Sequence, residues 1–227
     1  MIRQSPLAKV FAVTRSKKDF YAKMPELNPS DDRVMVMEAD LQDEDQLRSL
    51  VGKVCQFTDH LDLLVVANGI LHNKDMSPEK SLKELNPRFL MDYFLVNSLL
   101  APLLAKHFWP LLRGKKPSSF VSISAKVGSI EDNHLGGWYG YRASKAALNM
   151  FTRCIHLEAK RNKCSLQVLT IHPGTTVSEL SKPYIKNSKL KLHEPSDTAK
   201  NILKVIDKSP LSLSGKFISW DGSLIPF

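Results

Sequence analysis

Tyr141 and Lys145 are the two residues whose types and spacing most clearly could do chemistry. Residues four apart lie on one face of a helix, so the phenol and the ammonium can point into one site. A phenol has an unperturbed pKa of about 10, which makes it a poor acid at neutral pH. A nearby ammonium stabilises the phenolate, so we expect Lys145 to lower the pKa of Tyr141. Such a pair can protonate a carbonyl oxygen, or deprotonate an alcohol, while a hydride moves at carbon.

The sequence around this pair favours a catalytic role. Two exposed helix residues are the commoner explanation of a tyrosine and a lysine at this spacing. Here, however, the pair follows an apolar run and a glycine-rich loop, Gly136–Gly140, and it opens a helical pattern that includes Leu148 and Phe151. The strand, the loop and the helix together would place both side chains at one end of a packed element.

Short apolar runs alternate with stretches of helical periodicity along the chain. Each run has the length of a buried strand and is rich in Val, Ile, Leu or Phe. The six runs are Val10–Val13, Val34–Met37, Leu63–Ala67, Phe120–Ile123, Leu166–Ile171 and Phe217–Trp220.

Helix signals lie between these runs. We expect helices from residues 43–46 onward, from Pro87 towards Pro110, from Tyr141 to about Ala159, and from a Ser196–Asp197 cap to Ile206. The alternation predicts βαβ units in a doubly wound, Rossmann-like parallel α/β sheet. No repeat or linker interrupts the pattern, so residues 1–227 are expected to form a single domain.

The composition is that of a globular protein, with 43% hydrophobic and 24% charged residues among 227 and a formal net charge of +9. The cations cluster in 113–116, 160–163 and 186–191, beside residues that are typical of loops. A nucleic-acid surface would place such cations among exposed aromatic residues or along one helix face. We therefore expect solvated surface charge and no nucleic-acid partner.

Three scattered cysteines, Cys55, Cys154 and Cys164, form no CxxC pair, so neither a metal site nor a disulfide framework is expected. No apolar run reaches the length of a membrane span, and the N-terminus does not resemble a signal peptide. We expect a cytoplasmic protein without a membrane span.

Several stretches resemble the short-chain dehydrogenase/reductase family, in particular the branch that includes C-factor and sniffer-type carbonyl reductases. The resemblance is carried by Ser122–Ile130, by Gly136–Asn149 with Tyr141 and Lys145, and by the tail Ser214–Phe227. It extends from about Ile2 to the C-terminus.

The resemblance implies roles for four catalytic residues. Tyr141 would be the acid/base, Lys145 would lower its pKa and hold the nicotinamide ribose, and Asn97 would support the lysine through water. The usual substrate-orienting serine is replaced by Ala125. Ser124 is therefore the candidate for this role, with Ser129 as a second.

The resemblance also implies a nicotinamide cofactor, NADP(H) rather than NAD(H). Arg15, at the end of a strand, would pair with the 2′-phosphate, a role that suits a guanidinium. A solvated loop cation is the alternative for this residue. The further cofactor-binding residues would be Asp40, Leu41, Asn68, Gly69, Pro173, Gly174 and Thr176, together with Tyr141 and Lys145.

Two departures from the family pattern concern cofactor binding. The usual Asn-Ala-Gly turn reads Ala67-Asn68-Gly69, and no glycine occurs before Gly52, where members carry a first strand and a glycine-rich phosphate loop. We expect an N-terminally truncated sheet in which the first strand and glycine-rich loop are missing. Unpaired buried backbone groups cost roughly 1–3 kcal/mol each, so the sheet would be marginally stable, or its two halves would pair directly.

The sequence leaves two functions open. The first is an NADP(H)-dependent oxidoreductase that reduces a carbonyl or oxidises an alcohol, with a small-molecule substrate that the sequence does not identify. The second is a catalytically impaired protein of the same fold that acts in interaction or dimerisation. The helix from Tyr141, apolar on more than one face, could form a homodimer or homotetramer in either case.

Overall fold

The computed structural model describes residues 8–186 and 190–227. Lys189, which belongs to the cation cluster in residues 186–191, lies outside this range. Backbone contacts divide the chain into two compact units, Met1–Asp59 and His60–Phe227. The single domain expected from the sequence stays a prediction.

The first unit contains a two-stranded parallel sheet. Strand β1 (Val10–Thr14) pairs with β2 (Val34–Glu38). Helices α1 (Lys17–Lys23) and α2 (Glu44–Cys55) follow the two strands. The Asp43 carboxylate accepts two backbone N–H groups of the first turn of α2 and so fixes its start. The buried side chains come from β2, α2 and Ala39, whereas β1 and α1 contribute none.

The second unit contains a five-stranded sheet in the order β3-β4-β5-β8-β9. The parallel strands are β3 (Leu63–Val66), β4 (Ser118–Ile123), β5 (Leu166–His172) and β8 (Phe217–Ser219). Strand β9 (Leu224–Ile225) is antiparallel to β8, and the short strands β6 (Thr175–Thr176) and β7 (Leu192–His193) form a separate pair.

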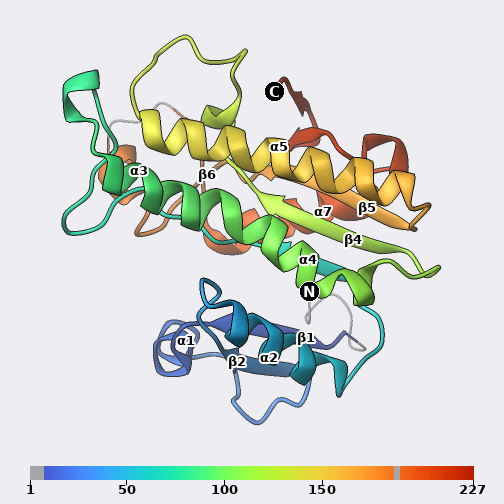
Figure 1. The fold of residues 1–227 in the computed structure, drawn as a ribbon. Coiled ribbons are helices and arrows are strands. Elements are labelled where there is room, and N and C mark those ends of the chain that lie inside the picture. Colours follow the sequence, from blue (N-terminus) through green and yellow to red (C-terminus); the bar gives the residue numbers. More distant parts are fainter. Residues whose placement is uncertain (1–7, 187–189) are drawn as a thin grey trace. The chain divides into compact units, whose positions relative to one another are not determined.

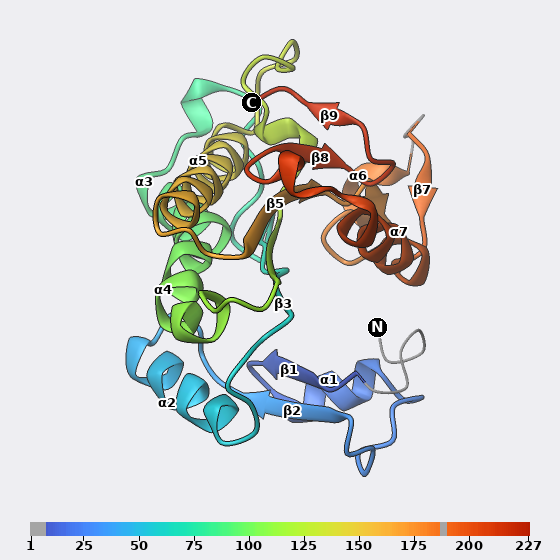
Figure 2. The same ribbon diagram turned by 90° about the vertical axis from the view of Figure 1, so that its right-hand side faces the viewer.

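Five helices belong to the second unit. They are α3 (Pro87–Phe94), α4 (Leu100–Leu112), α5 (Tyr139–Arg161), α6 (Lys182–Ile185) and α7 (Pro195–Lys208). Short helical turns are η1 (Leu82–Glu84), η3 (Lys126–Gly128) and η4 (Leu211–Leu213), and a π-helical segment, η2 (Leu95–Leu99), joins α3 to α4. Helices α4 and α5 cover one face of the sheet and α7 covers the other (Figures 1 and 2).

This arrangement confirms the predicted α/β architecture with a parallel central sheet. Each of the six apolar runs forms a strand. One predicted helix start was wrong, because α7 begins at Pro195 with Glu194 as its N-cap rather than at a Ser196–Asp197 cap. Proline is favoured at the first helical position, where its missing N–H has no intrahelical partner to lose.

The strand pairing bears on the expected gap in the sheet. Among the described residues, β1 pairs with β2 alone and β3 pairs with β4 alone, in separate sheets. Within the described residues, β1 and β3 each keep one edge without a strand partner.

The helical run Pro87–Leu112 is the one stretch of the described residues that is long and apolar enough to cross a membrane. The sequence led us to expect no such run. The run carries Asn97 and Ser98, which are buried and hydrogen-bonded to Ser144 of α5. Core helices of globular proteins satisfy the same length and composition test, and these hydrogen bonds pack the run against α5 within the second unit.

Candidate active site

The first turn of α5 is held by a buried carboxylate. Glu79 Oε2 accepts the Gly140 N–H at 3.1 Å, and the Glu79 carbonyl accepts the Trp138 N–H. A carboxylate at a helix N-terminus is stabilised by the helix dipole. A side chain at Gly140 would come within 2.9 Å of Glu79 Oε1 and closer still to Tyr93. Glycine is therefore required where α5 begins, one residue before Tyr141.

Tyr141 and Lys145 lie one turn apart on α5, as the sequence predicts, and both face the interior. Their exposed fractions are 7% and 3%. Lys145 Nζ lies 5.9 Å from the centroid of the Tyr141 ring and donates a hydrogen bond to the Ile123 carbonyl at 3.0 Å. Strand β4 ends at Ile123, so this bond ties the lysine to the carboxyl edge of the sheet.

Asn97 joins this pair from the π-helical segment η2. Its Oδ1 accepts the Ile70 N–H at 2.7 Å, and its Nδ2 donates to the Ile70 carbonyl and to Ser144 Oγ, each at 3.0 Å. Single π-helical turns often occur at functional sites, because they redirect a side chain out of the regular helical pattern. Here the turn directs the amide towards the loop after β3 and towards α5.

Gly69 marks the point where these groups meet. A Cβ atom at Gly69 would lie 3.7 Å from both Asn97 Oδ1 and Lys145 Nζ. The structure therefore brings together four residues that the sequence singles out, namely Gly69, Asn97, Tyr141 and Lys145. They come from three different loops or helices at the carboxyl edge of the parallel sheet, where ligands bind in open α/β folds.

Burial changes the ionisation of the central pair. It raises the pKa of Tyr141 to about 12 and lowers the pKa of Lys145 to about 8. The direction for Tyr141 is opposite to the expectation from the sequence. The cause is desolvation, which penalises the phenolate and the ammonium alike and here outweighs their attraction. At neutral pH the phenol therefore keeps its proton.

The serines near β4 are occupied by structural contacts. The buried Ser124 hydroxyl donates to Asn149 Oδ1 at 2.7 Å, whereas Ser129 Oγ accepts the Asp132 N–H. Ala125, between them, packs against the apolar cluster that contains Tyr141. The role of Ser124 in orienting substrate is untested by these contacts and stays a prediction.

The loop after β5 carries the predicted residues Pro173, Gly174 and Thr176. Gly174 has a φ of +77°, and a side chain there would come within 2.9–3.2 Å of Trp220 and His193. Thr176 Oγ1 lies 2.8 Å from Thr198 Oγ1. The preceding residue, His172, accepts the Lys126 N–H at Nδ1, and burial lowers the pKa of His172 to about 4. The neutral imidazole thus connects the end of β5 to the loop that follows β4.

Arg15, Asp40 and Leu41 lie in the first unit. Arg15 directly follows β1, is exposed, and makes no ion pair among the described residues. Asp40 follows β2 and accepts the Gln42 N–H, while its own N–H donates to Gln46 Oε1. The structure thus places these residues at the ends of the two parallel strands, and Arg15 is available to an anion.

Three aromatic residues that the sequence did not identify as site residues contact this region. Trp138 packs edge-to-face on Tyr141 and on Tyr184, and Tyr184 also packs on His72. All three lie in loops or short elements that follow parallel strands at the carboxyl edge. Their position directly after predicted strands could have identified them as site candidates from the sequence. No group of three or more potential metal ligands occurs among residues 8–186 and 190–227.

Comparisons with known proteins agree with this geometry. A family model described as short chain dehydrogenase matches residues 6–189. An uncharacterized oxidoreductase of Schizosaccharomyces pombe is 25% identical over 230 residues, which cover 96% of this chain and 87% of that protein.

Two solved structures share the fold. The carbonyl reductase Sniffer of D. melanogaster superposes with a TM-score of 0.85 and 22% identity, covering 98% of this chain and 90% of that one. The NADPH-bound carbonyl reductase from chicken fatty liver has a TM-score of 0.82 and 22% identity, covering 96% and 88%. With the family match spanning most of the sequence and the Tyr141–Lys145 site at the expected edge of the sheet, the chain belongs to the short-chain dehydrogenase/reductase family.

Proposed function

We propose that the protein reduces a small-molecule carbonyl compound to an alcohol with NADPH, and that Tyr141 is the proton donor. The observation that carries this proposal is the meeting of Tyr141, Lys145, Asn97 and Gly69 at the carboxyl edge of the sheet. The chicken carbonyl reductase with the same fold binds NADPH, which supports the choice of cofactor.

The ionisation of Tyr141 fits its role as the proton donor in carbonyl reduction. Burial raises its pKa to about 12, so the residue is a neutral phenol across the physiological range. A neutral phenol can donate a hydrogen bond to a carbonyl oxygen and then transfer its proton as negative charge develops there.

Lys145 supports this proton transfer by its charge. Its ammonium stabilises the phenolate that remains after the proton leaves, since the two groups lie on one face of α5. The bond from Nζ to the Ile123 carbonyl uses one of the three N–H donors. The remaining donors can bind a ribose hydroxyl at Gly69, and Asn97 holds the Ile70 backbone next to this position.

The residues present fit the nicotinamide half of NADPH. Lys145 has spare donors, Gly69 leaves space beside Nζ, and Pro173 and Gly174 would border the nicotinamide ring. Bound NADPH would supply the hydride that reduces the carbonyl carbon. In the first unit, Arg15 would pair with the 2′-phosphate, with Asp40 and Leu41 at the adenine. Asn68 would contribute to the adenosine site, and Thr176 to the nicotinamide site.

Steady-state NADPH oxidation with a panel of aldehydes, ketones and quinones tests the proposal. We expect saturable turnover with at least one carbonyl, and a lower KM for NADPH than for NADH. Turnover with NADH alone would contradict the cofactor assignment. Binding of neither cofactor, measured by fluorescence titration on folded protein, would reject the redox function. A cytoplasmic location is part of the same proposal, and cell fractionation tests it.

A second candidate function is self-association through the outer face of α5. Met150, Cys154 and Leu157 are exposed at helical spacing, with Met150 64% and Leu157 46% accessible. Such a stripe is typical of a helix that packs on another subunit. Sedimentation analysis of the wild type and of Met150→Glu tests it. A dimer that dissociates in the variant supports this role, and a monomeric wild type rejects it.

A further inference from the structure

The segment Ser178–Ile185, which we call the cover segment, lies over the Tyr141 site. Leu180 packs against the apolar cluster that contains Tyr141, and its Cδ1 would lie 4.0 Å from a Cβ at Gly69. Backbone hydrogen bonds from Ser181 and Lys182 to the Ser178 carbonyl hold the segment in a compact turn. The position of this turn over Tyr141 therefore depends on contacts with the rest of the unit.

His72 makes one such contact from the loop after β3. Its Nε2 lies 3.1 Å from the Glu179 carbonyl oxygen and 3.2 Å from the Leu180 carbonyl oxygen, across 107 and 108 residues of sequence. Carbonyl oxygens only accept hydrogen bonds, so Nε2 carries the proton and donates to both. The imidazole ring also packs edge-to-face on Tyr184, at 5.8 Å between centroids.

An unbroken series of edge-to-face ring contacts connects His72 to the proposed proton donor. Tyr184 packs on Trp138 at 5.0 Å, and Trp138 packs on Tyr141 at 6.2 Å. Trp138 has a left-handed backbone, with a φ of +51°, and it follows Gly136 and Gly137, which are also left-handed. This backbone conformation is uncommon for a bulky residue, and the indole contacts both Tyr141 and Tyr184.

We propose that His72 is a positioning residue that holds the cover segment over Tyr141, and that Trp138 and Tyr184 select flat, ring-containing carbonyl compounds. The proposal rests on the proposed carbonyl reductase function. Its chemistry follows from the surroundings of Tyr141, where the partly buried Ala125, Leu180 and Trp138 pack on one apolar cluster and Tyr184 packs on Trp138. A planar substrate can stack on these rings, whereas a flexible chain gains less from them.

Hydrogen exchange of the cover-segment amides tests the role of His72 without any activity. His72→Phe keeps a ring against Tyr184 but loses the donor, so we expect exchange of residues 178–185 to rise about tenfold. His72→Gln restores a donor and should return exchange to within about threefold of the wild type. His134→Phe, at an exposed loop position, is the matched control and should change nothing.

Unchanged exchange in His72→Phe would overturn the positioning role. If that variant fails to fold, Tyr184→Leu provides the second measurement, because it removes the ring contact and leaves His72 in place. We expect cover-segment exchange to rise in Tyr184→Leu as well. Exchange at the wild-type rate in this variant would show that these contacts do not hold the segment.

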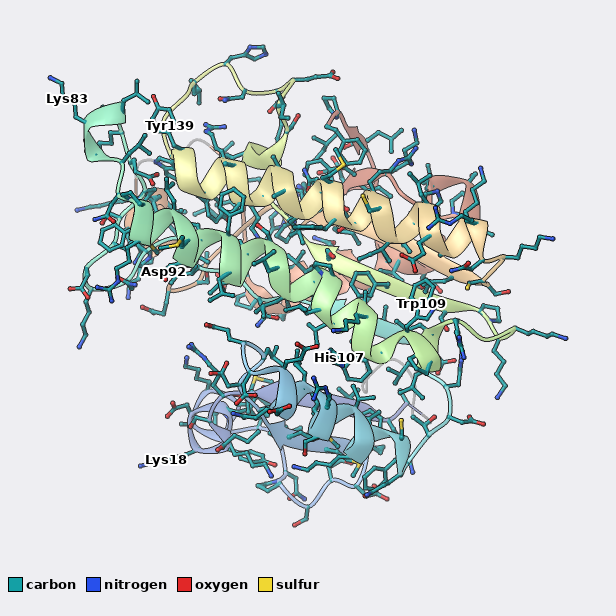
Figure 3. All side chains as sticks on the ribbon, viewed as in Figure 1. Lys18, Lys83, Asp92, His107, Trp109 and Tyr139 are labelled. Atoms are coloured by element: carbon teal, nitrogen blue, oxygen red, sulfur yellow. The ribbon has the colours of Figure 1, made fainter. Side chains whose placement is uncertain are left out.

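Substrate selection is tested with an aryl methyl ketone and an open-chain methyl ketone of equal carbon number. Tyr184→Leu should raise KM for the aryl ketone about tenfold and KM for the open-chain ketone less than about twofold, with kcat nearly constant. Tyr184→Phe should keep the wild-type ratio. Tyr139→Leu is the control, because Tyr139 begins α5 (Figure 3). Its exposed fraction is 37%, against 36% for Tyr184.

Equal changes for the two ketones in Tyr184→Leu would overturn the selection of flat substrates. A wild type that turns over neither ketone nor any other carbonyl would reject the proposed function instead. The exchange measurement still decides the role of His72 in that case, so the two failures are distinguishable.

Discussion

The two units differ in how completely their strands are buried. In the second unit, β4 and β5 are each paired on both sides, and Val121, Leu169, Ile171 and Ile218 form a core with no solvent exposure. In the first unit, β1 is paired on one side and carries no fully buried side chain. A two-stranded sheet has little independent stability. The residues proposed for proton transfer thus belong to the well-packed unit, whereas those proposed for the adenosine end belong to the less packed one.

This difference suggests that the chemical end of the site is organised before any ligand binds. Lys145 and Asn97 each hydrogen-bond to backbone at the carboxyl edge of the second unit. Side chains whose positions are fixed by packing and hydrogen bonds need little reorganisation on binding. Arg15, by contrast, is an exposed cation without an ion pair in the described part of the chain. Its position can adjust when an anion arrives.

The largest expected effect contrasts a truncation in the core of the second unit with one at an exposed position of the first. Leu169→Ala removes a fully buried side chain of β5 and should lower the free energy of unfolding by about 2–5 kcal/mol. Val13→Ala, in the partly exposed β1, should cost less than about 0.5 kcal/mol. Urea denaturation measures both. Similar losses for the two variants would remove the contrast between the units.

Hydrogen exchange in the wild type should show the same contrast. We expect amides of β4 to exchange at least about a hundredfold more slowly than amides of β1, since local opening is easier where one strand edge is unpaired. Mass spectrometry of peptic peptides resolves the two strands. Equal protection would mean that both units open together.

Arg15→Ala should lower the preference for NADPH over NADH, measured as the ratio of the two KM values, by about tenfold. Loss of a charge-assisted pair with the 2′-phosphate raises KM for NADPH, while KM for NADH, which lacks that phosphate, stays within about twofold. Steady-state kinetics with both cofactors measures the ratio. Lys9→Ala serves as control for general loss of positive charge. Unchanged KM values for both cofactors would assign Arg15 to the solvated surface, and a parallel rise would place it at a part of the cofactor that NADPH and NADH share.

The smallest effect concerns the buried ammonium of Lys145. Its folded pKa of about 8 lies below that of an unfolded lysine, so the folded protein binds fewer protons between these values. The stability of the wild type therefore rises with pH above about 8. Lys145→Met removes this burial cost and should be more stable by about 1–2 kcal/mol at pH 7.

The advantage of Lys145→Met should shrink as the pH rises towards 10, where the lysine is neutral in the folded state. Thermal melts at several pH values follow the difference between variant and wild type. The exposed Lys116→Met is the control and should show no such dependence. A stability difference between Lys145→Met and the wild type that does not change with pH would contradict a lowered pKa of Lys145.

Local patterns in the sequence were sufficient for the strands and for the Tyr141–Lys145 pair. The apolar runs report strand burial directly, and residues four apart on one helix meet whatever the rest of the fold does. The resemblance added Asn97, whose place depends on a π-helical segment that helical periodicity does not reveal.

Contacts across long sequence separations could not be predicted. His72 meets Glu179 and Leu180 only because the loops after β3 and β5 come together at one edge of the sheet. The direction of the Tyr141 pKa also depends on tertiary structure, since it follows from burial rather than from the neighbouring lysine. The division into two units is likewise a property of contacts, and no linker in the sequence marks it.

The central claim is that Tyr141 donates a proton to a carbonyl oxygen, and Tyr141→Phe tests it most directly. The variant keeps the ring that packs on Trp138 and Tyr93, so fold and NADPH binding should stay within about threefold of the wild type, whereas kcat for carbonyl reduction should fall about a thousandfold or more. A variant that binds NADPH and reduces the carbonyl at the wild-type rate would contradict the account.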